Sequence, residues 1–315
     1  MMNDVFFIVV GLVLLYFGAE GLVRGSSAVA LKLGLSPLVV GLTVVAYGTS
    51  MPELLVSVKS ALAGQSGIAV GNVVGSNIFN IAVILAIAAI ICPIKVNFQL
   101  VKIDVPIMIG VTLLMMFFFR DGALAQWEAG VLFAGIIIYT VGSILYAKKT
   151  TTQDVKAEFD ESLDRPKKPL WMDILFILGG LGLLVVGSNF LVDGSISIAR
   201  AWGVSEAIIG LTIVAAGTST PELAASIVAA LKKEPDIAIG GIVGSNIYNM
   251  LCILGAAGLI APINAGGVAW VDMFVMLGVS VLLVPILWSG FTIKRWEGGV
   301  LLVIYSGYLF WLWPK

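Results

Sequence analysis

Ten long apolar runs divide the sequence, with shorter polar segments between them. A membrane-spanning helix needs roughly 20 mostly apolar residues, whereas barrel strands would alternate in polarity over ~10 residues, which these runs do not do. Only 12% of the chain is charged, against about 25% in soluble domains. The sequence therefore predicts an all-α membrane protein with ten transmembrane helices. The predicted spans are 5–23, 35–60, 68–92, 103–119, 126–146, 172–192, 204–230, 237–261, 269–288 and 296–313.

The sequence repeats itself after 169 residues, without a gap over most of its length. GTSMPE at 48–53 matches GTSTPE at 217–222, and GSNIFN at 75–80 matches GSNIYN at 244–249. Because each repeat holds an odd number of helices, five, the second half must enter the membrane from the opposite side. Such inverted repeats are typical of secondary transporters, which bind substrate near the midplane where the repeats meet. We expect a first repeat at 1–147, a polar linker at 148–170 and a second repeat at 171–315.

Basic residues are distributed unevenly between the two sets of loops. Fourteen of the 18 Lys and Arg residues lie in the loops that join helices 1–2, 3–4, 5–6, 7–8 and 9–10. Cytoplasmic loops carry the excess of positive charge in membrane proteins. The sequence therefore predicts a multi-pass protein of the cell (inner) membrane, with a cytoplasmic linker and both termini outside.

Two glutamates, Glu53 and Glu222, lie well inside apolar runs at equivalent repeat positions. A carboxylate in the membrane is costly and indicates a functional site by default. A buried salt bridge is the alternative, but the nearest basic residue, Lys59, lies about two turns further along the same helix. The pseudo-two-fold axis should bring the two glutamates face to face. Two carboxylates at close range cannot both stay ionised, so protons or metal cations must lie between them.

A proline precedes each glutamate, at Pro52 and Pro221. Proline lacks an N–H and clashes with the carbonyl four residues earlier, so each helix should kink around its Gly-Thr-Ser stretch. Irregular backbone at membrane depth is tolerated where it lines a cavity or is buried in protein. We expect freed carbonyl oxygens to point at the site, with serine hydroxyls alongside. The carbonyls are those of Thr49, Thr218, Ala46 and Ala215, and the hydroxyls are those of Ser50 and Ser219.

Helices 3 and 8 should supply further oxygens. Ser76 and Asn80 lie one turn apart and share a helix face, and Ser245 with Asn249 repeats the arrangement. Asn77 and Asn246 are expected to point elsewhere, and the glycines of these helices to allow close packing. Helices 2, 3, 7 and 8 would then form a central ion-binding core.

The candidate ligands are all oxygens, and the chain has no histidine. An all-oxygen set suits Ca²⁺, Na⁺ or Mg²⁺ and disfavours zinc or copper. Because Mg²⁺ dehydrates reluctantly, a dry cage favours Ca²⁺.

The paired motifs GTSMPE/GTSTPE and GNVVGSNIFN/GGIVGSNIYN resemble the α-repeats of the cation/calcium exchanger superfamily, and the chain looks most like its prokaryotic sodium/calcium exchangers. The resemblance covers both halves. It implies that Glu53, Glu222 and the carbonyls of Thr49 and Thr218 bind Ca²⁺. It also implies a set of Na⁺ ligands: Ala46, Ser50, Ser76, Asn80, Ala215, Ser219 and Ser245.

One site position varies within that superfamily. Some members have Asp where this chain has Asn249. The asparagine removes a titratable group from the site and argues against potassium dependence. The central site is then left with two formal negative charges, which one Ca²⁺ would neutralise. Asn72 is replaced by Gly241 in the second motif, which we interpret as a packing difference.

These observations predict a secondary active antiporter that exchanges Na⁺ for Ca²⁺ by alternating access. A Ca²⁺/H⁺ exchanger is the nearest alternative, since the same carboxylates could carry protons. A cation channel is a second alternative, but channels usually place rings of ligands across symmetric subunits. No residue pattern supports an intramembrane enzyme. We expect no cofactor and no nucleic-acid partner, with Na⁺ and Ca²⁺ as substrates in a lipid bilayer and a functional monomer.

Overall fold

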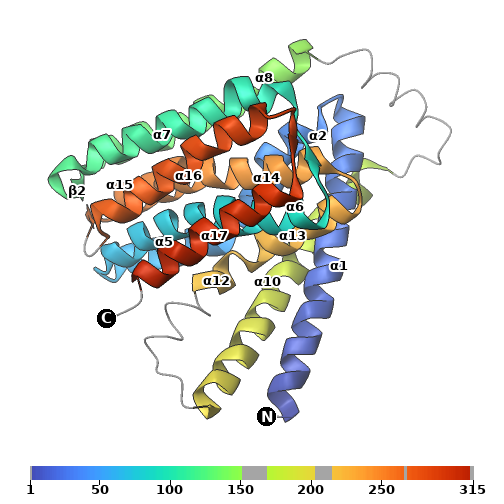
Figure 1. The fold of residues 1–315 in the computed structure, drawn as a ribbon, viewed down its shortest axis with the longest axis horizontal. Coiled ribbons are helices and arrows are strands. Elements are labelled where there is room, and N and C mark those ends of the chain that lie inside the picture. Colours follow the sequence, from blue (N-terminus) through green and yellow to red (C-terminus); the bar gives the residue numbers. More distant parts are fainter. Residues whose placement is uncertain (1, 151–168, 203–214, 266–267, 313–315) are drawn as a thin grey trace.

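The computed structural model describes residues 2–150, 169–202, 215–265 and 268–312, and it consists almost entirely of helices (Figure 1). Helices are the default for apolar runs in lipid, because they satisfy each backbone polar group within the segment. Within these ranges, seven helices are long and apolar enough to span a membrane, and the bent pair Pro37–Thr49 and Met51–Leu62 makes an eighth. An all-α multi-spanning membrane protein is thus confirmed. Most of the predicted linker and the start of the predicted span 204–230 lie outside the described residues.

The first half begins with one long helix, and its later helices are interrupted by π-helical turns. A π turn accommodates an extra residue and is frequent at functional sites. In chain order the elements are α1 (Met2–Leu33), α2 (Pro37–Val40), η1 (Gly41–Val45), α3 (Ala46–Thr49), α4 (Met51–Leu62), α5 (Ser66–Phe79), η2 (Asn80–Leu85), α6 (Ala86–Ile91), β1 (Ile94–Lys95), η3 (Leu100–Asp104), α7 (Val105–Phe118), η4 (Phe119–Asp121), β2 (Ala123–Leu124) and α8 (Gln126–Thr150).

The second half repeats this order within its described residues, except that the residues equivalent to η3 and η4 form no separate elements there. Its elements are α10 (Leu170–Ala201), α12 (Ala215–Thr218), α13 (Thr220–Leu231), α14 (Pro235–Tyr248), η7 (Asn249–Ile253), α15 (Leu254–Ile260), β3 (Ile263–Asn264), α16 (Trp270–Trp288), β4 (Thr292–Ile293) and α17 (Arg295–Leu312).

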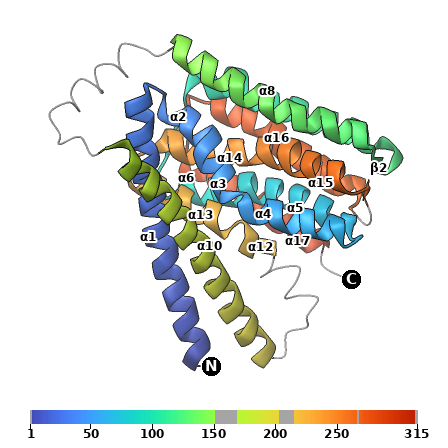
Figure 2. The same ribbon diagram turned by 180° about the vertical axis from the view of Figure 1, so that it is seen from behind.

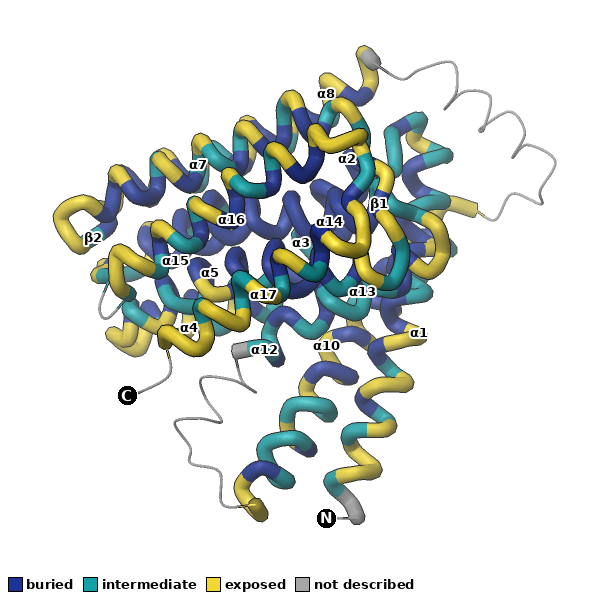
Figure 3. The backbone as a smooth tube through the Cα atoms, in the orientation of Figure 1, coloured by how far each residue is buried: buried dark blue, intermediate teal, exposed yellow. Residues whose placement is uncertain are grey.

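Two short antiparallel strand pairs join the halves, at opposite ends of the helix bundle (Figure 3). Replacing each residue of one pair by its repeat equivalent, 169 residues later or earlier in the chain, gives the other pair, so the halves dock with two-fold pseudosymmetry. The register is Ile94 with Ile293 and Lys95 with Thr292 in one pair, and Leu124 with Ile263 and Ala123 with Asn264 in the other.

Helices α1 and α10 lie side by side and project from the rest of the bundle (Figures 1 and 2). Glycines bring their backbones into direct contact. A Cβ at Gly180 would lie 2.6 Å from the carbonyl oxygen of Gly18, and a Cβ at Gly194 would lie 2.8 Å from that of Asp4. The residue numbers rise along one helix as they fall along the other, so the two equivalent helices run antiparallel, as inverted repeats require.

The centre of the molecule is occupied by the helical segment Pro235–Ile260, in which 94% of the membrane-span window is buried (Figure 3). Only 28% is buried in the corresponding windows of α1, α8 and α10. Their exposed side chains include large apolar ones such as Phe17, Ile138 and Leu178. These outer helices therefore present the apolar surface that lipid requires.

Candidate functional site

The two proline-containing helices are broken at equivalent serines. Ser50 separates α3 from α4 with φ −83° and ψ 10°, and Ser219 separates α12 from α13 with φ −91° and ψ 10°. The first break bends the helix by 47°. Proline two residues later removes a hydrogen-bond donor and clashes with the preceding turn. The predicted interruption around Gly-Thr-Ser is confirmed in both halves.

Glu53 and Glu222 lie just beyond these breaks and are buried, with 1% and 3% of their surface exposed. Each accepts a hydrogen bond from the serine of the opposite half. Ser219 Oγ donates to Glu53 Oε1 at 2.9 Å, and Ser50 Oγ donates to Glu222 Oε1 at 2.8 Å. Each glutamate therefore lies beside the helix break of the other half, at a serine three residues before the other glutamate. Among the described residues neither takes part in an ion pair, so the salt-bridge alternative finds no support there.

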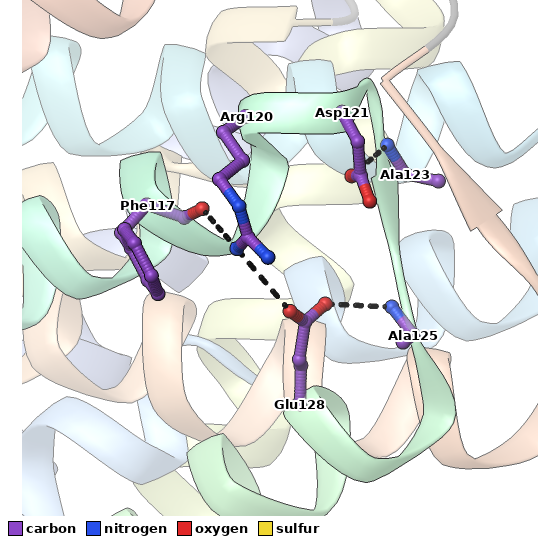
Figure 4. Close-up of polar contacts among 6 residues, drawn as sticks. All are labelled: Phe117, Arg120, Asp121, Ala123, Ala125 and Glu128. Carbon is purple, nitrogen blue, oxygen red and sulfur yellow. Dashed lines mark hydrogen bonds and ion pairs between the residues drawn. The ribbon is translucent and has the colours of Figure 1, made fainter.

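The other buried acidic side chains have structural partners. Figure 4 shows Glu128 at the start of α8, where its Oε2 accepts the backbone N–H of Ala125 at 2.9 Å and its Oε1 lies 3.8 Å from Arg120. Such a carboxylate caps a helix N-terminus. The remaining partners are Tyr139 and Gln99 for Asp104, Lys32 for Asp173, and the Lys294 N–H with Ser289 for Glu297.

Four asparagines form a buried hydrogen-bonded group across the pseudo-two-fold axis. Asn80 Nδ2 donates to Asn246 Oδ1 at 2.9 Å, and Asn249 Nδ2 donates to Asn77 Oδ1 at 3.0 Å. Asn77 and Asn246 each donate through Nδ2 to the backbone carbonyl of the other at 3.3 Å. All four are about 1% exposed. Asn80 and Asn249 each begin a π-helical turn, η2 and η7.

Within the part of the chain that the structure describes, four buried side-chain oxygens of this region have no hydrogen-bond partner. They form two symmetry-related pairs, one on the glutamates and one on the π-turn asparagines. Element η2 packs against α13, which carries Glu222, and η7 packs against α4, which carries Glu53. An unpartnered buried acceptor is costly and needs an explanation. The atoms are Glu53 Oε2, Glu222 Oε2, Asn80 Oδ1 and Asn249 Oδ1.

The predicted serines lie near this group. Ser219 Oγ also contacts Ser76 Oγ at 3.2 Å, and Ser245 Oγ donates to the Ala46 carbonyl at 3.4 Å. That carbonyl also accepts the Ser50 N–H at 3.1 Å. The two carbonyls that were predicted to bind Ca²⁺ together with the glutamates belong to Thr49 and Thr218. The Thr49 hydroxyl donates to the Val45 carbonyl at 3.0 Å, and Thr218 is half-buried. Ala215 begins α12, and its side chain lies outside the described atoms.

Two expectations about asparagines were wrong. Asn77 and Asn246 do not point elsewhere but lie on the axis and hold the π-turn asparagines. The three-residue spacing of Asn77 and Asn80 placed both on one helix face and was the available signal. Asn72 is more than a packing residue, since its Nδ2 donates to the Glu53 carbonyl at 3.2 Å and to Ser57 Oγ at 2.9 Å.

A cavity of about 380 Å³ opens between α4 and α10 and reaches the edge of the site. Its lining includes Pro52, Lys59, Asn189 and Thr218. The symmetry-related region between α13 and α1 is filled instead. There, residues equivalent to the cavity lining are buried in one apolar cluster: Ala19, Val23, Ala225 and Val228.

The sequence profile of the family described as sodium/calcium exchanger protein matches residues 4–145 and 172–313, one match in each half. The chain belongs to this family. It is 33% identical over 341 residues to the sodium/calcium exchanger MaX1 of Methanosarcina acetivorans, with 96% of each chain covered. It is 39% identical over 314 residues to CaxA of Alkalimonas amylolytica, named as an antiporter, with 98% of each chain covered.

A solved structure of the sodium-calcium exchanger NCX_Mj matches with a TM-score of 0.84 and 30% sequence identity, over 98% of each chain. This member of the sodium/calcium exchanger family is therefore a membrane transporter and not an enzyme. Membership of this exchanger family also argues against the channel alternative. The activity that the family and the matched structure support is cation/Ca²⁺ antiport.

Proposed function

We propose that the chain exchanges Na⁺ for Ca²⁺ at a site built around Glu53 and Glu222. The observation that carries the proposal is the set of four unpartnered buried oxygens on Glu53, Glu222, Asn80 and Asn249. Two facing carboxylates supply two negative charges, and amide oxygens supply neutral ligands. Ca²⁺ takes six to eight oxygen ligands. The carbonyls of Thr49 and Thr218 and the serine hydroxyls would complete such a shell.

The same oxygens favour Na⁺ over H⁺ as the coupling ion. A proton binds to a single carboxylate oxygen, so the proton-loaded state of a Ca²⁺/H⁺ exchanger would leave the buried amide oxygens of Asn80 and Asn249 without a partner, whereas Na⁺ could bind to them. Na⁺ is a hard cation that, like Ca²⁺, is bound by several oxygens. With Asn rather than Asp at 249, the two glutamates are also the only titratable groups among the twelve predicted site residues.

Three further features belong to the proposal. The chain has ten spans, with helices 2, 3, 7 and 8 as the ion-binding core. It acts as a monomer in the inner membrane. The inner-membrane location is supported by the name of a relative that is 33% identical, the inner membrane protein YrbG of Escherichia coli. The linker is cytoplasmic and both termini are outside, as the distribution of Lys and Arg favours.

Exchange would follow from alternating access. An empty site leaves two unpaired carboxylates in a low-dielectric interior, which opposes its movement across the membrane. Filling by Ca²⁺ or by Na⁺ removes this penalty. One of two alternating states would have a cavity on one side of the site and a filled region on the other. The cavity beside Lys59 and the filled region beside Val228 fit such a state, in which the open side is the one predicted to be outside.

The test is Ca²⁺ uptake into proteoliposomes that contain the purified chain. An outward Na⁺ gradient at equal pH on both sides, with a protonophore present, should drive uptake. A pH gradient without Na⁺ should not. Uptake that follows the pH gradient and ignores Na⁺ would replace this proposal with Ca²⁺/H⁺ exchange.

A further inference from the structure

The amide groups of the four central asparagines have a fixed orientation, because the network ends on two backbone carbonyls. A carbonyl oxygen can only accept a hydrogen bond. The Asn246 carbonyl therefore requires the Nδ2 of Asn77, at 3.3 Å, and the Asn77 carbonyl requires the Nδ2 of Asn246, also at 3.3 Å. Each of these two side chains must consequently direct its Oδ1 the other way.

The next pair of contacts follows from the first. Asn246 Oδ1 can only accept, so Asn80 must present its Nδ2 to it, and the 2.9 Å contact has this polarity. By the same argument Asn249 presents its Nδ2 to Asn77 Oδ1 at 3.0 Å. The remaining atom of each π-turn amide is then its oxygen. These are the Oδ1 atoms of Asn80 and Asn249 that have no partner.

We infer that Asn77 and Asn246 are positioning residues, which hold the amides of Asn249 and Asn80 with oxygen rather than NH₂ toward the cation. This inference rests on the proposed cation site and deepens it. An NH₂ group in the same place would direct a partial positive charge at the ion. The network is crossed, because Asn246 of the second half orients Asn80 of the first and Asn77 orients Asn249.

The crossed arrangement provides a matched test within one molecule. Asn246→Leu removes the acceptor that orients Asn80 and leaves the partner of Asn249 in place. Binding of ⁴⁵Ca²⁺ to purified protein in Na⁺-free detergent is measured for Asn246→Leu, for Asn80→Ala, for Asn249→Ala and for each double variant. Asn246→Ala replaces Asn246→Leu if the leucine variant does not purify as a folded protein.

Asn246→Leu should weaken Ca²⁺ binding about tenfold, the size expected for losing one charge-assisted contact. In the Asn80→Ala background the same substitution should change Ca²⁺ binding less than about twofold, because the Asn80 amide that Asn246 orients is no longer present. In the Asn249→Ala background the factor of about ten should persist. Asn77→Leu should show the reverse dependence, losing its effect only in the Asn249→Ala background.

Equal factors in the two backgrounds would overturn the positioning role, since a general loss of packing does not distinguish Asn80 from Asn249. If Asn80→Ala and Asn249→Ala alone leave Ca²⁺ binding unchanged, the amide oxygens are not ligands, and the inference fails together with that part of the proposed site. Glu53→Gln tests the site independently of the asparagines. Loss of Ca²⁺ binding in this variant supports a site at the glutamates, and unchanged binding contradicts it.

Discussion

Glu53 and Glu222 each have one carboxylate oxygen bonded to a serine of the opposite half and one without a partner. This arrangement differs from that of Glu128, whose two oxygens face a backbone N–H and an arginine. A carboxylate that caps a helix stabilises the fold, whereas two facing carboxylates repel each other until a cation lies between them. The two kinds of buried glutamate should therefore respond differently to the same substitution.

Glu53→Gln and Glu222→Gln should each abolish Ca²⁺ transport and leave a folded, membrane-inserted protein. Each removes one of two repelling charges, so thermal stability without ions should be kept, while the stabilisation by added Ca²⁺ should disappear. Glu128→Gln is the control, with transport retained and stability changed little, because glutamine can still accept the Ala125 N–H at the start of α8. Uptake assays and thermal unfolding in detergent, with and without Ca²⁺, measure both effects, and transport by either site variant would refute the assignment.

Ser50→Ala and Ser219→Ala test the hydrogen bonds that cross between the halves. Each removes a donor at 2.8–2.9 Å from a carboxylate, and hydrogen bonds to charged groups contribute about 1.5–3 kcal/mol. The Ca²⁺ dissociation constant should rise about tenfold or more. Ser280→Ala, whose hydroxyl bonds only to the Met276 carbonyl of its own helix, should leave binding unchanged. A similar change in all three variants would contradict a specific role.

At this scale, the sequence was sufficient to predict that the two glutamates lie buried where the halves meet, and not to predict how the central asparagines are oriented. Depth within an apolar run and the 169-residue repeat identified Glu53 and Glu222, because both cues depend on the chain alone. The direction of Asn77 depends on the partner half and on the π turn that begins at Asn80. Neither can be read from one helical period, since a π turn changes which residues share a face.

Among the elements, the contact between α1 and α10 depends on glycine at specific positions. Two adjacent residues of α10 differ sharply in their surroundings. A Cβ at Gly180 would meet Gly18 O and Leu22 N at 2.6 Å, whereas a Cβ at Gly179 would have nothing within 4 Å. Because backbone atoms cannot move aside as a flexible side chain can, the first position has no room for a methyl group.

Gly180→Ala should therefore destabilise the protein by about 1–3 kcal/mol through overpacking and should reduce transport. Gly179→Ala should be neutral or slightly stabilising, since alanine is the better helix former. Thermal unfolding of both variants in one detergent makes the comparison. Equal stability of the two variants would show that α1 and α10 can move apart at Gly180 to make room for a methyl group without a loss of stability.

Helix positions were predictable to within a few residues where an apolar run ends at a turn. The predicted span 269–288 corresponds to α16 (Trp270–Trp288), and 68–92 corresponds to Ser66–Ile91. The predicted span 5–23 is shorter than α1, which continues to Leu33. Helical hydrogen bonds are made by the backbone, so the polar residues that ended the apolar run did not end the helix. The strand pairs between the halves were not predictable, because two residues give no periodic signal.

The whole molecule departs from its own symmetry at the cavity between α4 and α10. Val56 lines the open side, and its repeat equivalent, Ala225, is 3% exposed in the filled region. With the two native cysteines, Cys92 and Cys252, replaced by alanine, Val56→Cys should react readily with a water-soluble maleimide. Ala225→Cys should be protected. Equal reactivity would mean that both sides are open to water to the same degree in solution.

An ion pair joins α1 to the end of α13 on the filled side. Lys232, just after α13, lies 2.6 Å from Glu20 on α1. The repeat equivalents of these residues are Ala63 and Asn189, which cannot form an ion pair. Glu20→Gln should raise the maleimide reactivity of Ala225→Cys, and the charge-reversed pair Glu20→Lys with Lys232→Glu should restore protection. Lys233→Gln, one residue further along, is the control. Protection unchanged by Glu20→Gln would exclude a latch at this position.

The side-chain hydrogen bonds that hold the glutamates and the π-turn asparagines run from one half of the chain to the other: Ser50 to Glu222, Ser219 to Glu53, Asn80 to Asn246, and Asn249 to Asn77. A polypeptide released after residue 150 would hold Glu53 and Asn80 without any of these partners. One half alone therefore lacks the partners that complete the site. The two halves of a split protein would have to insert with opposite topologies and associate before either could retain a single cation.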